Sequence, residues 1–297
     1  MTTADYPPPV DKLLTLGDAR DSMSHWPDYL AYGLGPEHIP DLIRMATDEE
    51  LYVAGSDSLE VWAPVHAWRA LGQFRAEAAA EPLTGLLHRI DDNQDDHVGE
   101  ELPEVYGMIG PAAIPALATY LADAAHPLYA RVAAAHSFGE IGANHPGSRA
   151  DCVAALTAQL ERFAETDPTL NAFLVSYLMD LKAIESAPVM ERAFAAGQVE
   201  LPVAGDWEDV QIEMGLRQTR TTPKPNYAAS LVGPELAAQF AALSQRLPSE
   251  TGPSSSGNIQ RRKAKKRDKR SHKSRAAKRV EKSNPSPGVK ALAGLSG

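Results

Sequence analysis

Residues Glu101–Leu121, ELPEVYGMIGPAAIPALATYL, have the pattern of a helix, a tight turn and a second helix. Apolar residues of the first half recur at i, i+3, i+4 and i+7, which places them on one helix face: Leu102, Val105, Tyr106 and Ile109. Gly110 and Pro111 end this helix, because glycine adopts a left-handed conformation at low cost and proline lacks the N–H that would continue it. The second half repeats the spacing: Ile114, Leu117, Ala118 and Leu121. Two such helices cannot bury their apolar faces alone, so the stretch predicts neighbouring copies of itself.

Copies of this pattern are present along the chain. Gly35–Leu42, GPEHIPDL, repeats the G-P-x-x-I-P-x-L pattern of Gly110–Leu117, and the offset of 75 residues fits two repeats of about 37. Prolines take equivalent places at the start of the second helices: Pro40, Pro82, Pro115 and Pro188. The residues that close the first helices recur at steps of 35, 32 and 40: Phe74, Ile109, Ile141 and Leu181. A constant unit with variable steps is typical of a helical solenoid, because insertions go into its loops.

One copy carries a resemblance to a known family of repeats. Arg131–Gly142, RVAAAHSFGEIG, resembles the consensus of HEAT-like repeats of the phycocyanobilin-lyase type, which runs roughly R-x-A-A-A-x-A-L-G-x-I-G. The resemblance covers about residues 26–197, and the chain also looks like a bacterial HEAT-repeat family of unassigned function. It implies an all-α fold in which a HEAT-like solenoid forms a right-handed α-α superhelix. Such repeats occur in scaffolds, bilin lyases and DNA-alkylation glycosylases, and the matching positions are core and turn positions, so no catalytic residue follows from them.

The pattern divides the chain into four parts. Arg220–Tyr227, RTTPKPNY, breaks the helical spacing, and Pro248–Gly257 is rich in Ser, Gly and Pro. The predicted parts are an N-terminal arm at 1–25, a solenoid of about five repeats plus a cap at 26–218, a linker with one amphipathic helix (234–247) at 219–257, and a disordered basic tail at 258–297.

Composition favours a reducing, non-membrane setting. The single cysteine, Cys152, excludes an intramolecular disulfide and is expected to be a buried structural thiol. No secretory signal follows Met1, and no apolar run approaches 18 residues. We therefore expect a cytoplasmic protein that has no contact with membranes.

The net charge of −10 combines two opposed parts. Residues 261–282 hold 13 Lys and Arg against two acids, or +11, whereas residues 1–260 hold 15 basic and 37 acidic residues, or −22. The basic run could bind RNA or DNA phosphates, act as a nuclear address, fold back onto the acidic body, or only solubilise the chain. No aromatic residue interrupts it, so base stacking is not expected. Its candidate contact residues are Arg261, Arg262, Lys263, Lys265, Lys266, Arg267, Lys269, Arg270, Lys273, Arg275, Lys278, Arg279 and Lys282.

The acidic loop DDNQDDHVGEE contains the only candidate metal ligands. Asp91, Asn93 and Asp95 have the opening spacing of a calcium loop. The pattern then fails, because Asp96 stands where glycine is required and Leu102 where glutamate is required. The favoured interpretation is an inter-repeat loop that caps the next helix and complements its dipole.

Nothing in the sequence predicts catalysis or a cofactor. His136 and Ser137 are adjacent on a helix and do not face one another. Nucleophile elbows, phosphate-binding loops and zinc-type cysteine and histidine clusters are all missing from the sequence. The leading hypothesis is a non-enzymatic scaffold that lays a basic or extended segment of a protein partner along the acidic solenoid. The alternatives are a bilin-lyase-like chaperone that holds a tetrapyrrole chromophore, and an RNA- or DNA-associated factor that acts through the tail.

Overall fold

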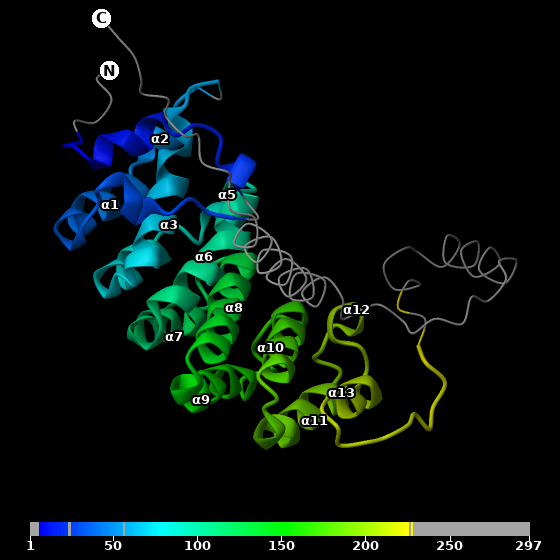
Figure 1. Cartoon of the computed structure of the whole chain (residues 1–297). Coiled ribbons are helices and arrows are strands. Elements are labelled where there is room, and N and C mark those ends of the chain that lie inside the picture. The colour runs from blue at the N-terminus through cyan, green and yellow to red at the C-terminus, as the bar shows by residue number, and fades with distance from the viewer. Residues whose placement is uncertain (1–5, 23–24, 56, 226, 228–297) are drawn as a thin grey trace, which may run out of the picture. The chain divides into compact units, whose positions relative to one another are not determined.

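The computed structural model describes residues 6–22, 25–55, 57–225 and 227, and all regular secondary structure in them is helical (Figure 1). The all-α prediction is therefore confirmed. The chain divides into two compact units, residues 1–238 and 239–297, and the described residues belong to the first. The predicted helix at 234–247 and the predicted tail at 258–297 lie outside the described residues.

The described residues form thirteen α-helices joined by short 3-10 helices. The α-helices are α1 (Ile39–Ala46), α2 (Glu49–Tyr52), α3 (Ala63–Phe74), α4 (Ala80–Thr84), α5 (Arg89–Asp92), α6 (Asp96–Ile109), α7 (Ile114–Ala122), α8 (Leu128–Asn144), α9 (Arg149–Leu160), α10 (Pro168–Asp180), α11 (Ala187–Ala195), α12 (Leu201–Ala204) and α13 (Trp207–Glu213). The 3-10 helices are η1 (Val10–Thr15), η2 (Ala19–Ser22), η3 (Tyr29–Tyr32), η4 (Pro36–His38), η5 (Glu60–Trp62), η6 (Glu77–Ala79), η7 (Pro111–Ala113), η8 (Pro146–Ser148) and η9 (Ile184–Ser186).

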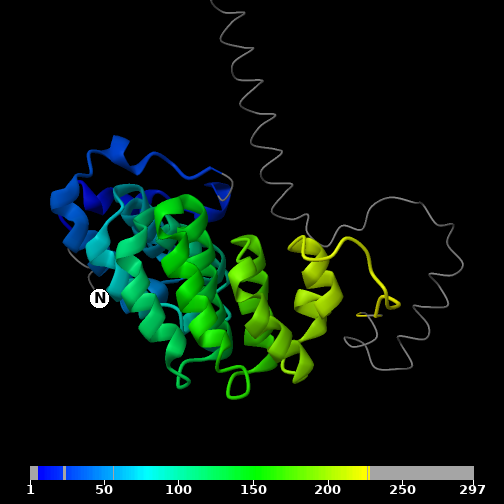
Figure 2. The ribbon, with the colours of Figure 1, turned by 90° about the horizontal axis from the view of Figure 1, so that it is seen from below.

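The helices of the first unit form two layers (Figures 1 and 2). In the A layer, α3, α6, α8 and α10 pack side by side in chain order. In the B layer, α1, α4, α7, α9 and α11 follow one another in the same way. Each A-layer helix is followed in sequence by a B-layer helix, so the unit is a stack of helix pairs with α12 and α13 at its end.

Successive A-layer helices approach closely at equivalent glycines that are 35 residues apart: Gly72, Gly107 and Gly142. A Cβ atom at Gly107 would lie 2.7 Å from Nδ2 of Asn144 on α8. One at Gly142 would lie 2.7 Å from Cδ2 of Leu181, at the end of α10. Glycine at these places therefore permits the distance at which the helix pairs stack.

The turn between α6 and α7 needs glycine for two reasons. Gly110 has φ +87° and ψ −152°, which differs from the left-handed helical C-cap that the sequence predicts. An added Cβ would also come within 2.8 Å of the His145 imidazole. That ring bonds the Gly107 carbonyl through Nε2 at 3.0 Å, so the turn after α6 is held by the end of α8.

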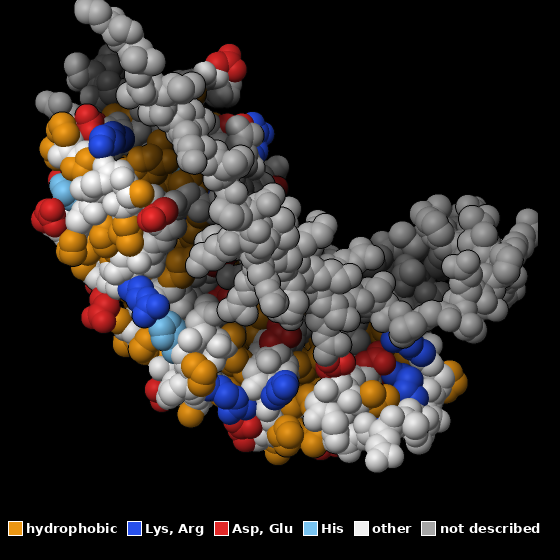
Figure 3. Space-filling view, in the orientation of Figure 1, with side chains coloured by type: hydrophobic (Ala, Val, Ile, Leu, Met, Phe, Trp, Pro, Cys, Tyr) orange, Lys and Arg blue, Asp and Glu red, His pale blue; other side chains and the backbone are white. Residues whose placement is uncertain are grey.

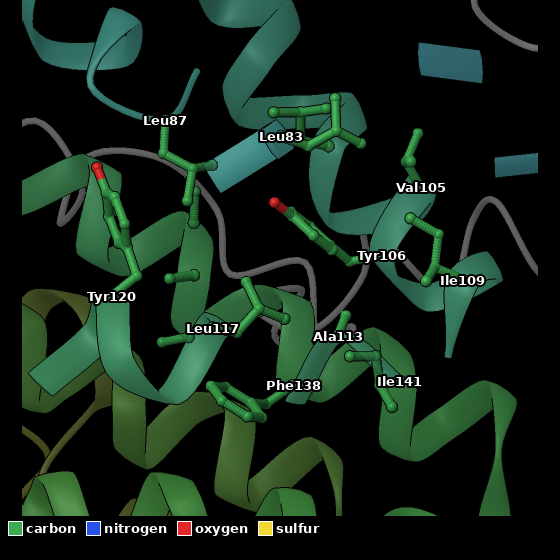
Figure 4. Packing of buried hydrophobic residues seen from close by; sticks show 14 of the residues in the cluster. Leu83, Leu87, Val105, Tyr106, Ile109, Ala113, Leu117, Tyr120, Phe138 and Ile141 are labelled. Carbon is green, nitrogen blue, oxygen red and sulfur yellow. The ribbon is translucent and has the colours of Figure 1, made fainter. Parts of the chain in front are cut away.

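The core is continuous through both layers. Figure 4 shows side chains of α4, α6, α7 and α8 around Leu117. Tyr106, Leu117, Phe138 and Ile141 are all fully buried, and the Tyr106 hydroxyl donates to the Ala80 carbonyl at 3.2 Å. These contacts pair the apolar stripes that the repeat pattern predicts.

The predicted N-terminal arm at 1–25 is part of this core where the structure describes it. Tyr6, Val10, Leu13 and Ala19 are buried, and η1 packs against α3. The Tyr6 hydroxyl donates to Asp48 Oδ2 at 2.7 Å. The sequence pattern did not predict this packing, because the proline-rich start and short 3-10 turns of the segment lack the periodicity of a repeat helix.

The predicted linker from residue 219 is held against α13 over its described part. Arg220 bonds the Asp206 carboxylate at 2.5 and 2.8 Å and the Asp209 carboxylate at 2.7 Å. Glu208 accepts hydrogen bonds from Thr221 and Thr222. The described fold therefore continues beyond the predicted boundary at 218.

Among the described residues, no single helix is long and apolar enough to cross a membrane. Helix α6 and residues 111–122 meet the length and composition criteria only as a pair bent by 114°.

Candidate interaction surface on the A layer

The exposed side of α6, α8 and α10 forms a surface that we call the A face. It consists of half-buried or exposed side chains at helical spacing: Glu104, Met108, His136, Glu140, Phe173, Tyr177 and Asp180. Their helices are neighbours in the A layer, so the side chains form adjacent rows. Carboxylates and aromatic rings dominate this surface.

The helices behind this face hold almost no positive charge. The three helices that carry the A face, α6, α8 and α10, contain six Asp and Glu residues and a single Lys or Arg, Arg131; one of the six acids, Glu101, is buried and paired with Arg69 of α3. Arg131 is buried, and its Nε donates to the Leu121 carbonyl at 2.9 Å. It therefore ties α8 to the end of α7, and these three helices place no exposed Lys or Arg beside the carboxylates.

Three rings connect α8 and α10 on the A face. The imidazole of His136 stacks on the Tyr177 ring with centroids 5.0 Å apart and planes 8° apart. Phe173 lies one turn earlier on α10, with its ring centroid 6.2 Å from that of Tyr177. Such offset stacking fixes the orientation of the rings and adds to their packing energy.

The carboxylates of the A face share one negative field. Burial raises the pKa of Asp180, and Glu140 and Glu213 of α13 raise it further, while His136 opposes them. Nε2 of His136 lies 3.5 Å from Oε1 of Glu140. A raised carboxyl pKa means that the ionised form is costly, so a cation placed here would stabilise it.

Two carboxylates on the B side pair with arginines. Glu161 pairs with Arg192 at 2.5 Å, and Glu185 pairs with Arg149 at 2.8 Å. Figure 3 shows Lys and Arg side chains near α9 and α11, beside acidic ones. These two B-side carboxylates have cationic partners, whereas α6, α8 and α10 carry no exposed Lys or Arg.

The corresponding side of α3 is covered by the chain itself. His66, Arg69 and Gln73 follow helical spacing, and each bonds an N-terminal stretch. Arg69 Nη2 donates to the Ala19 carbonyl at 3.1 Å, and Nη1 donates to Ser22 Oγ at 2.9 Å. Gln73 donates to the carbonyl of residue 27 at 2.7 Å and accepts from the backbone N–H of residue 29 at 2.9 Å. A row of polar side chains on an A-layer helix therefore holds non-repetitive chain.

A buried ion pair lies beneath this cover. The Arg69 guanidinium bonds both carboxylate oxygens of Glu101 on α6, at 2.6 and 2.7 Å. Trp68 Nε1 donates to the same carboxylate at 3.2 Å, and His97 Nδ1 lies 3.9 Å from it. These donors lower the pKa of Glu101 to about 2 against the opposing effect of burial.

The structure places the three candidate metal ligands in different roles. Asp91 accepts from the backbone N–H groups of Tyr129 and Ala130, at 3.1 and 2.8 Å, and so caps α8 from another repeat. Asp95 caps α6 by accepting from the Val98 N–H, which confirms the predicted capping of the next helix. Asn93 is exposed at the end of α5. Among the described residues, no group of three or more His, Cys, Asp or Glu side chains could hold a metal ion.

The remaining candidates have clear outcomes. Cys152 is buried, as predicted, and burial raises the pKa of its thiol to about 11. The Ser137 hydroxyl bonds the Ala133 carbonyl of its own helix at 2.8 Å, so it does not pair with His136. The thirteen basic residues between Arg261 and Lys282 lie outside the described residues, and their contacts with nucleic acid or a partner stay a prediction.

Comparison with protein-family models, curated proteins and solved structures finds no match. The class of protein is therefore defined by its own architecture, an all-helical stack of helix pairs with an acidic and aromatic A face.

Proposed function

We propose that this chain is a non-enzymatic scaffold of the HEAT-like repeat type that binds a basic, extended segment of a partner protein along the A face. The observation that carries the proposal is the composition of the three helices of the A face, in which six acids stand against one buried arginine. The recurring helix pairs and the glycines at 35-residue spacing support the repeat assignment.

Charge complementarity selects a cationic partner. A Lys or Arg side chain near Glu140, Asp180 and Glu213 would offset the repulsion that, together with the larger effect of burial, raises the pKa of Asp180. Each exposed pair contributes only about 0.2–1 kcal/mol, so affinity requires several such contacts in register. The apolar stems of Lys and Arg also pack well on rings such as Tyr177 and Phe173.

The contacts of α3 with the N-terminal stretches favour an extended segment as the ligand of the A face. Its polar row holds the N-terminal stretches mainly through their backbone carbonyls. A segment without its own secondary structure leaves such groups free, and the A face offers carboxylates that would accept its N–H groups and side-chain cations.

The proposal is tested by comparing peptide ligands that differ only in charge. Full-length protein would be titrated with a labelled peptide of about twelve residues carrying Arg at alternate positions, and with matched peptides carrying Gln or Glu there, by fluorescence anisotropy at low salt. We expect binding of the Arg peptide only, weakened by salt because exposed charges are screened. Equal binding of the Gln peptide, or no binding of the Arg peptide, would overturn the proposal.

A further inference from the structure

His66 on α3 connects two N-terminal stretches, Gly17–Ser22 and Trp26–Tyr29. The side chain is almost fully buried. Its Nδ1 lies 2.7 Å from the Tyr29 hydroxyl, and its Nε2 lies 2.9 Å from the Gly17 carbonyl oxygen. A carbonyl oxygen can only accept, so Nε2 carries the hydrogen and Nδ1 accepts from the tyrosine. The two bonds in this arrangement belong to the neutral imidazole, because a protonated ring would donate to the Tyr29 oxygen instead of accepting from it.

The surroundings oppose a charge on this ring. Burial is the largest effect and lowers the pKa of His66, and the Arg69 guanidinium on the same helix lowers it further. The hydrogen bond to the Gly17 carbonyl is the largest opposing effect, and Glu101 of α6 and Asp18 of the first stretch act in the same direction as that bond. Glu101 is already bonded to Arg69 through both oxygens, and Asp18 is paired with Arg20 at 2.6 Å.

We propose that His66 is a proton-operated latch whose protonation releases the two stretches from α3. The added proton goes to Nδ1, which then donates instead of accepting. The Tyr29 O–H must turn away from it, and a second cation arises in a buried place beside Arg69. Exposure of the ring to water removes both costs, so protonation and release of the stretches are linked.

Release uncovers the polar row of α3, which consists of His66, Arg69 and Gln73. Arg69 occupies on α3 the place that Glu104 occupies on α6, 35 residues later. Acid would thus lengthen the exposed side of the A layer by one helix. This inference stands on the geometry around His66 and does not depend on what the A face binds.

Hydrogen exchange of the full-length chain tests the latch. Protection factors, corrected for intrinsic exchange rates, would be measured between pH 7.5 and 5.0 for peptides covering residues 17–22 and 26–33, with α8 as reference. The folded pKa is lowered, so protection is complete above the ordinary value near 6.5 and falls below it, by at most about tenfold per pH unit for one proton. Unchanged protection in these two stretches, or an equal fall in α8, would overturn the proposal.

Two variants and a control isolate His66. His66→Gln retains an N–H donor near Nε2 and cannot titrate, so its protection should not change with pH. Tyr29→Phe removes the hydrogen bond to neutral imidazole, so release should begin at a higher pH. His126→Gln changes a histidine on the loop before α8 and should keep the wild-type profile. A wild-type profile in both His66→Gln and Tyr29→Phe would contradict the latch, and Tyr29→Phe alone decides the matter if His66→Gln does not fold.

Discussion

The Arg69 guanidinium and the Glu101 carboxylate form a two-bond ion pair that joins α3 to α6, and Arg69 is fully buried. Both partners make further bonds, to Ser22 and the Ala19 carbonyl on one side and to Trp68 on the other. A buried charge with all its donors paired is tolerated, whereas an uncompensated one is costly. The pair therefore fixes how the helix pairs α3/α4 and α6/α7 meet under the N-terminal cover.

Glu101→Gln should destabilise the protein by about 3–5 kcal/mol, because it leaves the buried Arg69 without its counter-charge. The free energy of unfolding would be measured by urea titration followed by circular dichroism. Glu100→Gln removes an exposed charge from the neighbouring position and should change stability by less than about 0.5 kcal/mol. Equal effects of the two substitutions would show that the pair does not hold the repeats together.

The same pair predicts a loss of stability in acid. The folded pKa of Glu101 is about 2 and the ordinary value is 4.5, so its contribution is complete above pH 4.5 and is lost as pH falls toward 2. Wild type and Glu101→Gln should therefore converge in stability across this window. The contribution of His97 to stability depends on pH in the opposite sense, because its raised pKa gives stability at low pH that is lost as pH rises. A constant difference between the two proteins from pH 5 to pH 2 would contradict this assignment.

Gly107→Ala should destabilise the stack by about 1–3 kcal/mol, because the new methyl group would overlap Asn144 and the Cβ of Glu140. Thermal unfolding would measure the change. The control is Gly147→Ala, because a Cβ there meets nothing within 4 Å. If both variants unfold at the same temperature as wild type, glycine at position 107 is not needed for the close approach of α6 and α8.

Asp91→Ala should cost about 0.5–2 kcal/mol, because two N–H groups of the first turn of α8 lose their acceptor. Hydrogen exchange at the start of α8 should rise in this variant. Asp92→Ala changes the exposed neighbour and should leave that turn protected. Added Ca²⁺ should not alter either result, and a rise in melting temperature with Ca²⁺ that needs Asp91 would revive the metal interpretation.

Much of the fold could be predicted from local patterns. The i, i+3, i+4, i+7 spacing around Tyr106 and Leu117 defined helices and their buried faces, and proline positions placed the second helices. The second helix that Pro82 marks is less regular than the pattern predicts, since the structure ends α4 at Thr84 and begins α5 only at Arg89. Periodicity finds amphipathic faces but does not show where a helix is interrupted.

Contacts between distant repeats could not be predicted in the same way. Asp91 looked like a metal ligand or a local cap, and its partners are 38 and 39 residues away on α8. Arg69 and Glu101 are 32 residues apart, and nothing in either local pattern pairs them. Two signals in the sequence were missed: the equal spacing of Gly72, Gly107 and Gly142, and the presence of only one Lys or Arg in α6, α8 and α10.

The most direct test of the central proposal, a basic ligand on the A face, changes the protein rather than the ligand. The A-face variant Glu140→Gln, Asp180→Asn, Glu213→Gln removes two carboxylates of the A face and the α13 carboxylate that acts on Asp180. It would be compared with Glu77→Gln, Glu81→Gln, Glu191→Gln, which removes the same charge from exposed positions on the B side. Affinity for the Arg peptide would be measured at one low salt concentration. We predict that the A-face variant binds about tenfold more weakly than wild type and that the B-side variant binds like wild type. Equal losses in the two variants would mean that net charge alone attracts the peptide, which would contradict a binding site on the A face.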